Sequence, residues 1–577
     1  MAQHRARLLA VVAATAVALT VVGTQSGAQA GGGGGHGGHG GHGPKPPERP
    51  TKVVVIVVDA LSKEIVDTYG MRNVQALMKD GVDTPKGYLG HTGSVTVVTH
   101  NVVTTGASPK HMGWTNEGYR DVDGLLGAPG GLYITSNFGR DQMAPLQQAA
   151  GYPHLSDYLD DTGKVFTVSP KGYAAWGLSG PGSANTSTIT FGSKTCPVPG
   201  SNPPATTRHR APTGWNVPAY FSADCGSRWV VARDTAYDTL QYPAQLYPAT
   251  DDRYVVGHDP AHQGGDIWAT DAVLEIMGQE DDGWSGIFVS LPGVDKAAHM
   301  WGGVNDPEGA TPGYDPMTHM QYATETADAQ VGRIMQALED SGQLDDTLVV
   351  LTADHGSVAA DEGHFHGDFE PVNDYGYFNW YYGSPANDVP YLSPQEALQP
   401  LIDGTDDGTG KTNVGLSYSD SSLNVWLRDQ SPERVAEAAA IMEDLADVTA
   451  VWQRSGDHYD RVTPVRWDRM HGAEKRWFAT KAQELVDTQA ADYGPDLIAT
   501  LPDDTTYSVL GDHGGIQRAS QQVPIVFAGA NTSHQDLRAE VRSVDIMPTI
   551  LRTMGIAPTS PMDGIAYELP TLKRGRH

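Results

Sequence analysis

Four apolar runs of the sequence each lead into aspartate and histidine residues. Runs of this length, rich in β-branched side chains, predict buried strands. They are residues 53–58 before Asp59, 286–291 before Asp295 and His299, 347–352 before Asp354 and His355, and 507–510 before Asp512 and His513. Because the carboxyl ends of strands in an open α/β sheet form one edge, these side chains are expected to meet there. The sequence therefore predicts a site for more than one metal ion.

The chemistry of such a site follows from the types of ligand. Aspartate and histidine together suit zinc or a similar divalent ion, whereas magnesium and calcium sites rely on oxygen ligands. Two such ions about 4 Å apart can stabilise both the attacking and the leaving oxygen of a displacement at phosphorus. Residues 91–106 supply candidate nucleophiles, the hydroxyls of Ser94, Thr96 and Thr99. Their Val- and Thr-rich composition predicts a strand, and periodicity alone does not choose among the three.

The elements that position these residues alternate between strand and helix patterns. Helices are predicted at residues 71–79, 320–338, 432–442 after a Ser431 cap, and 544–554. This alternation predicts an α/β fold, with a mostly parallel central sheet and helices on both faces. Since the four runs extend from residue 53 to residue 513, they must converge in one catalytic domain, residues 51–566. Residues 180–280 and 360–500 are then insertions near the site.

The two ends of the chain have different compositions. Residues 1–30 predict a secretory signal peptide: Arg5 and Arg7 precede an apolar run, and Ala28-Gln-Ala30 resembles a cleavage site. A retained membrane anchor is the alternative. Residues 31–50 are rich in Gly, His and Pro and predict a flexible linker, while residues 567–577 form a basic tail. In an oxidising compartment, Cys196 and Cys225 are expected to form a disulfide.

The overall charge limits the partners. The sequence has 39 Lys and Arg residues against 69 Asp and Glu residues, a formal net charge of -30. So acidic a chain repels nucleic-acid phosphates, and no nucleic-acid polymer is expected as a partner. A small phosphorylated substrate held by metal ions is compatible with this charge. Beyond the signal no stretch of about 18 apolar residues occurs, so no membrane partner is expected after its removal.

The ordered motifs resemble a known family. The sequence resembles the alkaline phosphatase superfamily, and within it the type I phosphodiesterase/nucleotide pyrophosphatase branch. The motifs that carry the resemblance are, in order, Asp59, the Thr/His segment, Asp295-x-x-x-His299, Asp354-His355-Gly356 and His513-Gly514. The resemblance covers about residues 51–566. In that branch a threonine lies four residues before a histidine and ten before a glycine. Thr96, His100 and Gly106 match both spacings, which implies that Thr96 is the nucleophile and begins a helix. That implication overrides the strand prediction.

The resemblance also implies roles for the other residues. One zinc ion would be held by Asp59, Thr96, Asp354 and His355, and a second by Asp295, His299 and His513. The expected reaction passes through a phosphothreonine intermediate. Asn116 would bind a phosphate oxygen, with one residue deleted relative to the family spacing, and Lys171 would bind the phosphate. His364 and His366 are alternative ligands, although solvent-facing loop positions are favoured for both.

Two departures from the family pattern affect the expected substrate and the local backbone. Val98-Thr99-His100 stands where the family has Pro-Asn-His, and Tyr173 stands where phosphomonoesterase relatives have an arginine. A monoanionic diester needs fewer cations in its binding site than a dianionic monoester does, so small diesters or nucleotide-like substrates are expected. An alkaline phosphomonoesterase is the first alternative. A non-catalytic secreted metal-binding protein is the second.

Overall fold

The central strand of the largest sheet is β1 (Lys52–Val58), and all of its residues are buried. It pairs in parallel with β9 (Trp284–Leu291) on one side and β10 (Thr347–Thr352) on the other. A strand covered on both faces needs a continuous apolar run, which residues 53–58 supply. The computed structural model describes residues 49–135, 138–190, 195–197, 206–208, 263–305, 319–361, 363–367, 395–530 and 532–570.

This sheet has eight strands among the described residues. The outer strands are β2 (Val82–Asp83), β5 (Lys164–Val168), β6 (Thr186–Ile189), β18 (Val526–Gly529) and β19 (Gln535–Asp536). The strand order is β19-β2-β18-β10-β1-β9-β5-β6. From β10 to β6 every pair is parallel, whereas β18 is antiparallel to both of its neighbours. The predicted α/β fold with a mostly parallel central sheet is confirmed.

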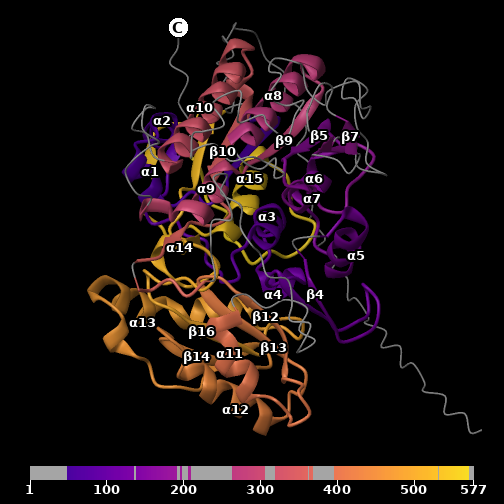
Figure 1. Cartoon of the computed structure of the whole chain (residues 1–577). Helices are drawn as coiled ribbons and strands as arrows, with labels where there is room; N and C mark the ends of the chain where they lie inside the picture. The colour runs from indigo at the N-terminus through magenta and orange to yellow at the C-terminus, as the bar shows by residue number, and fades with distance from the viewer. Residues whose placement is uncertain are drawn as a thin grey trace, which may run out of the picture. The chain divides into compact units, whose positions relative to one another are not determined.

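Two groups of helices cover the sheet. One contains α1 (Lys63–Tyr69), α2 (Arg72–Asp80), α8 (Gln263–Glu280), α9 (Gly293–Trp301) and α10 (His319–Asp340). The other contains α3 (Thr96–Thr105), α5 (Arg140–Ala150), α6 (Leu155–Leu159), α7 (Gly172–Ser179) and α15 (Ile546–Met554). Helix α10 packs against α8 (Figure 1) and buries its predicted apolar positions, from Met320 to Leu338.

A second sheet of five strands follows in the sequence. Its order is β12 (Val414–Ser419), β13 (Ser422–Leu427), β16 (Leu497–Thr500), β14 (Ala450–Ser455) and β15 (His458–Arg461), with every pair antiparallel. Helices α11 (Gln395–Gly404), α12 (Pro432–Glu443) and α13 (Gly472–Val486) cover it and provide apolar cores of their own. Figure 1 shows these elements in orange and gold. They occupy most of the predicted insertion 360–500. Much of the stretch 180–280 lies outside the described residues.

The remaining elements are short. β11 (Val358–Ala359) pairs with β17 (Gly511–Asp512), β3 (Gly118–Asp121) with β4 (Gly131–Ile134), and β7 (Thr195–Pro197) with β8 (Thr206–Arg208). The short helices are α4 (Pro109–Met112), α14 (Arg518–Gln521), η3 (Gly303–Asn305), η4 (Leu344–Asp346), η5 (Trp467–Arg469), η6 (Asp487–Gln489) and η7 (Ser543–Asp545). No helix in the described ranges combines the length and apolarity needed to cross a membrane.

The predicted strand at residues 507–510 is wrong. The chain bends there, and β17 begins only at Gly511. The backbone groups of residues 507–510 bond to separate segments: Tyr507 N donates to Asp420 O at 3.0 Å, and Leu510 O accepts from Ala360 N at 2.9 Å. Hydrogen bonds from residues of one run to different segments do not make a ladder. Three of the four predicted runs are therefore strands of the large sheet.

Residues 91–106, whose composition predicts a strand, contain helix α3 instead. The helix ends at Gly106, whose φ of 65° is the left-handed cap that glycine favours. Thus the helix implied by the family resemblance is confirmed, despite the replaced Pro-Asn-His. The predicted helices α2, α12 and α15 are also present, and α12 begins after Ser431 as expected. The predicted signal peptide and most of the linker lie outside the described residues, as does Cys225 of the predicted disulfide.

Candidate active site

Asp59, Asp354 and His355 form the first group of ligand side chains. Asp59 directly follows β1, and Asp354 and His355 lie just beyond the parallel neighbour β10, so the sheet brings them together. One ligand atom from each lies within 4.8 Å of the others. His355 Nε2 is 3.2 Å from Asp59 Oδ1 and 3.5 Å from Asp354 Oδ2. All three side chains are buried.

Asp295, His299 and His513 form a second such group. Asp295 and His299 lie one turn apart on α9, and the spacing of four residues puts both on one face of the helix. His299 Nε2 is 3.0 Å and His513 Nε2 is 3.7 Å from Asp295 Oδ1. The rings of His355 and His513 stack with centroids 3.5 Å apart, so the two groups adjoin.

The histidines are oriented as metal ligands require. In each ring Nδ1 faces a backbone carbonyl: Gly511 O for His299 at 2.8 Å, Gly356 O for His355 at 3.1 Å, and Ser94 O for His513 at 3.2 Å. A proton on Nδ1 satisfies these contacts and leaves the Nε2 lone pair available. Burial lowers the pKa of His355, and lowers that of His513 well below its ordinary value, which favours the neutral ring.

The carboxylates of Asp59 and Asp354 lie in surroundings that disfavour their negative charge, whereas Lys171 and Lys296 help to keep Asp295 ionised. Burial, with the charges of Asp295 and Asp354, raises the pKa of Asp59 to about 8. Burial raises the pKa of Asp354 to about 6. Asp59 Oδ1, Asp295 Oδ1 and Asp354 Oδ2 are buried without a hydrogen-bond partner. Buried carboxylate oxygens without partners beside neutral imidazoles are the donor set that divalent cations bind, so these residues fit two such ions.

Lys171 lies between the two groups. Its Nζ is 2.5 Å from Asp59 Oδ2 and 2.6 Å from Asp295 Oδ2, and its side chain is almost fully buried. Burial alone would lower the pKa of Lys171, but the carboxylates of Asp295 and Asp59 raise it well above its ordinary value. The predicted phosphate-binding lysine thus contacts one carboxylate from each group.

Thr96 is the first residue of α3, and the segments on either side of it contact both groups. One turn later, His100 Nδ1 donates to Thr96 O at 2.7 Å and lies 3.6 Å from Asp354 Oδ2. Two residues earlier, Ser94 O contacts His513 Nδ1. The N–H groups and the dipole at a helix amino terminus favour an anion. Thr96, with 4 % of its surface exposed, therefore lies at an end of α3 suited to a phosphate.

The other two candidate hydroxyls have different surroundings. Thr99 Oγ1 lies 2.9 Å from His91 Nε2, whereas Ser94 Oγ is buried without a hydrogen-bond partner. Asn116 lies close to this segment, because a Cβ at Gly93 would come within 2.1 Å of Thr115 O. Its Nδ2 is 3.1 Å from Gln489 Oε1. The backbone next to the predicted phosphate-binding amide therefore packs against the segment that leads into α3.

Several residues near the site went unrecognised in the sequence. Lys296 Nζ lies 4.0 Å from Asp295 Oδ2, and its place directly after Asp295 was the available signal. Asp420 and Ser421 contact the loop of His513 from the second sheet, and no local pattern marks them. The alternative ligands His364 and His366 lie outside both groups, facing Asp447 Oδ2 at 3.2 and 2.7 Å.

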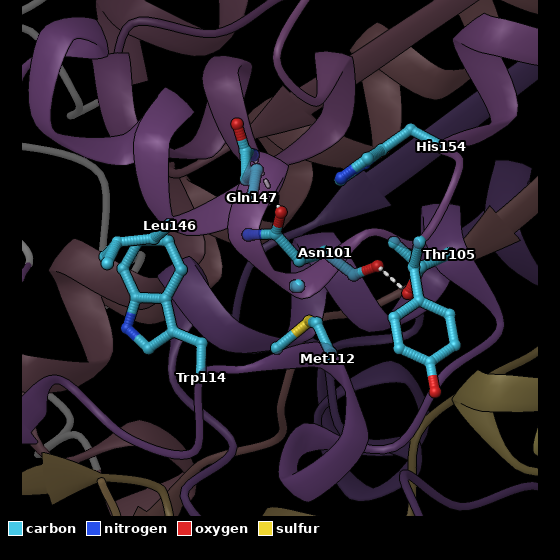
Figure 2. Close-up of a pocket in the computed structure, with 9 residues that line it drawn as sticks. Asn101, Thr105, Met112, Trp114, Leu146, Gln147 and His154 are labelled. Atoms are coloured by element: carbon cyan, nitrogen blue, oxygen red, sulfur yellow. Dashed lines mark hydrogen bonds between the residues drawn. The ribbon is translucent and has the colours of Figure 1, made fainter. Parts of the chain in front are cut away.

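A small pocket lies on another side of α3. Figure 2 shows it lined by Asn101, Thr105, Trp114, Gln147 and His154, among others. Its space is on the scale of a single water molecule. It contains none of the carboxylates described above, so it is not the site at which their chemistry would occur.

Comparison with known families gives a match over most of the chain. Residues 53–126 and 182–515 match the family described as type I phosphodiesterase / nucleotide pyrophosphatase. The chain belongs to this family. This family member is a phosphoric-ester hydrolase. No curated protein matches the sequence.

Solved structures agree on the fold of this hydrolase. It is similar to alkaline phosphatase PafA, with a TM-score of 0.58 and 12% identity over 90% of this chain and 98% of that one. It is also similar to murine ectonucleotide pyrophosphatase/phosphodiesterase 5, as an inactive variant in complex with AMP. The TM-score is 0.51 and the identity 10%, over 89% of this chain and 97% of that one. Identities this low show the fold alone.

Proposed function

We propose that this hydrolase is a secreted, two-zinc phosphodiesterase that acts through Thr96 on small diesters or nucleotide-like substrates. The observation that carries the proposal is the pair of adjoining Asp/His groups beside the amino terminus of α3. Thr96 begins that helix, and its neighbours His100 and Ser94 contact one group each. A nucleophile beside two metal sites suits in-line displacement at phosphorus, because the two ions can stabilise the attacking and the leaving oxygen.

Different residues of the chain would bind the metal ions and supply the nucleophile in such a displacement. One zinc ion would be held by Asp59, Thr96, Asp354 and His355. The other would be held by Asp295, His299 and His513. Bound zinc lowers the pKa of a hydroxyl and stabilises attacking and leaving oxygens. The Thr96 oxygen forms a bond to phosphorus as the bond to the first alcohol breaks, which leaves a phosphothreonine ester. Water then hydrolyses this ester, and Thr96 recovers its hydroxyl.

Other groups bind the phosphate through this sequence. The N–H groups of the first turn of α3 face its oxygens and offset their charge without rearrangement. The Lys171 ammonium and the Asn116 amide donate to oxygens that do not react. Lys171 is already held by Asp59 and Asp295, so its ammonium is oriented before substrate arrives.

The preference for diesters rests on Tyr173, which stands where monoesterase relatives have an arginine. Burial raises the pKa of Tyr173 to about 12, so it is a neutral donor, not a second cation. One observation favours the alkaline phosphomonoesterase alternative. Lys296 lies 4.0 Å from Asp295 Oδ2 and brings another cation to the second group, which a dianionic monoester would reward.

The test compares the two substrate classes on zinc-loaded protein. We expect a higher kcat/KM for bis-p-nitrophenyl phosphate than for p-nitrophenyl phosphate. The reverse order would replace the diester proposal with the monoesterase alternative. Acid quenching during diester turnover should leave a phosphoryl ester on the peptide that contains Thr96, detected by mass spectrometry. No adduct and unchanged turnover in Thr96→Ala would remove Thr96 from the mechanism.

Two further parts of the proposal have direct tests. AMP is bound by the murine phosphodiesterase 5 variant, so AMP is the first product analogue to examine as a competitive inhibitor here. Secretion predicts that expressed protein leaves the cytoplasm and that its amino terminus begins near residue 31. Amino-terminal sequencing of exported protein checks this, and a retained Met1 would favour the anchor alternative.

A further inference from the structure

His513 reaches the site in a different way from the other ligand side chains. Asp59, Asp354 and His355 lie at the ends of β1 and β10, and Asp295 and His299 lie on α9. His513 follows the two-residue strand β17 and lies in a loop. A loop side chain needs other contacts to hold its position.

The turn between β12 and β13 supplies these contacts. Ser421, fully buried in this turn, donates to His513 O from its backbone N at 3.0 Å and from Oγ at 2.7 Å. Ser421 Oγ accepts from Gly515 N at 3.0 Å. Ser421 O accepts from Gln517 Nε2 at 2.5 Å. One serine is thus bonded to the ligand residue itself and to two residues that follow it in the loop.

Asp420 extends the same contact. Its carbonyl accepts from Tyr507 N at 3.0 Å, and its Oδ1 accepts from Ser422 N and Oγ at 2.6 and 2.8 Å. A Cβ at Gly514 would lie 2.1 Å from Asp420 Oδ2, and the φ of Gly514 is +95°. The backbone next to His513 therefore packs so closely on the turn that only glycine fits there.

The opposite side of the loop contacts the segment that precedes Thr96. Gly93 N donates to Gly514 O at 2.9 Å, and His513 Nδ1 faces Ser94 O at 3.2 Å. Held between this segment and Ser421, the imidazole directs Nε2 to within 3.7 Å of Asp295 Oδ1. Shifting the His513 backbone away from the turn would move Nε2 out of ligand position.

We infer that Ser421 is a positioning residue for the metal ion of the second group, held by Asp295, His299 and His513. This inference rests on the two-metal function proposed above. The five-stranded sheet, through the turn at residues 419–422, then sets the affinity of one ion without contacting it. The first group, whose ligands follow strands of the large sheet, does not depend on this turn.

The variant Ser421→Ala tests this by metal-binding titration against a competing chelator. Loss of an outer contact to a metal ligand weakens binding about 10- to 100-fold, and we expect this loss for one of the two ions only. Ser156→Ala is the matched control. It removes a fully buried hydroxyl that donates to Ser179 O, also at 2.7 Å, in α6. It should leave both affinities unchanged.

Two backgrounds identify which ion is affected. Asp354→Asn weakens the first group, and on that background Ser421→Ala should lower the affinity of the remaining ion. Asp295→Asn weakens the second group, and there Ser421→Ala should have no effect. If Ser421→Ala lowers the metal affinity equally on both backgrounds, or on neither, the inference is overturned. Gln517→Met removes the donor to Ser421 O and should show the same selectivity, so it replaces Ser421→Ala if that variant does not fold.

The wild-type titration separates the inference from the function on which it rests. Two tight ions in the wild type and in Ser421→Ala alike would end the positioning role and leave the two-metal hydrolase intact. Fewer than two ions in the wild type would overturn both. Two ions in the wild type and one selectively weakened ion in Ser421→Ala is the result that supports the inference.

Discussion

The imidazole of His91 lies 2.9 Å from the hydroxyl oxygen of Thr99, through Nε2, while its Nδ1 faces Leu89 O at 3.3 Å. A proton on Nδ1 leaves Nε2 to accept from the Thr99 hydroxyl. Both side chains are buried, and burial lowers the pKa of His91 to about 4, so the neutral ring persists at neutral pH. The Thr99 hydroxyl therefore already has an internal partner.

This contact leads to a prediction about the nucleophile. Thr96→Ala should lower kcat by about 10⁴-fold or more, because loss of a nucleophile removes the covalent route. Its zinc content should change little, since Asp and His ligands remain in both groups. Thr99→Ala and Ser94→Ala are the controls, measured with the same diester. Normal rates in Thr96→Ala with loss in either control would reassign the nucleophile.

Lys171→Met should destabilise the metal-free protein. It leaves the buried carboxylates of Asp59 and Asp295 without the ammonium that contacts both, and breaking a buried pair costs about 3–5 kcal/mol. Added zinc should restore part of the loss, because the ions supply positive charge. Urea unfolding with chelator and with zinc measures this. Lys52→Met is the control: its partner Asp282 is largely exposed, and a similar loss there would contradict the explanation.

Lys296→Gln should change substrate preference more than overall rate. Removing a cation near Asp295 should lower kcat/KM for p-nitrophenyl phosphate about 10-fold and change that for the diester less, since the monoester carries more charge. Lys164→Gln, which removes a half-exposed lysine paired with Glu280, provides the comparison. Equal effects on both substrates would mean that Lys296 does not sense the charge of the phosphate.

Chelation should abolish activity and lower stability together. An ion that binds only the folded state at 100 times its Kd adds about 2.7 kcal/mol to the free energy of unfolding, and this is lost on its removal. Zinc should restore turnover, while calcium should not, because the two groups include imidazole ligands. Activity that survives exhaustive chelation would contradict a metal-dependent reaction.

His154 should make the fold sensitive to acid. It is buried beside the pocket in Figure 2, and burial lowers its pKa to about 3. Below about pH 6.5 the His154 imidazole binds a proton in the unfolded chain but stays neutral in the folded chain. Stability present above this pH is therefore lost as the pH falls toward 3, by about 1.4 kcal/mol per unit. His154→Gln should reduce that slope in urea unfolding at pH 7 to 4.5, and replacing the half-exposed His458 should not.

Sequence reasoning predicted most of what is local. Asp59 and Asp354 come within two residues of the ends of buried apolar strands, and Asp295 and His299 share a helix face through their spacing, so few residues fix each position. It failed at residues 507–510, where an apolar run is buried without pairing in the large sheet. It also failed at residues 96–105, where valine and threonine favour a strand and the chain forms helix α3. The strand preferences of these residues are weak, so tertiary packing overrides them. Only the resemblance to a family corrected that prediction.

The sequence by itself determined the ligand types, their order along the chain, and the parallel sheet that collects several of them at one edge. Only the tertiary structure decided that Lys171 lies between Asp59 and Asp295, and that Ser421 holds the loop of His513. Such contacts join residues about 90 to 125 positions apart. They depend on how whole sheets and helices pack, and no periodicity or spacing within one segment records that packing.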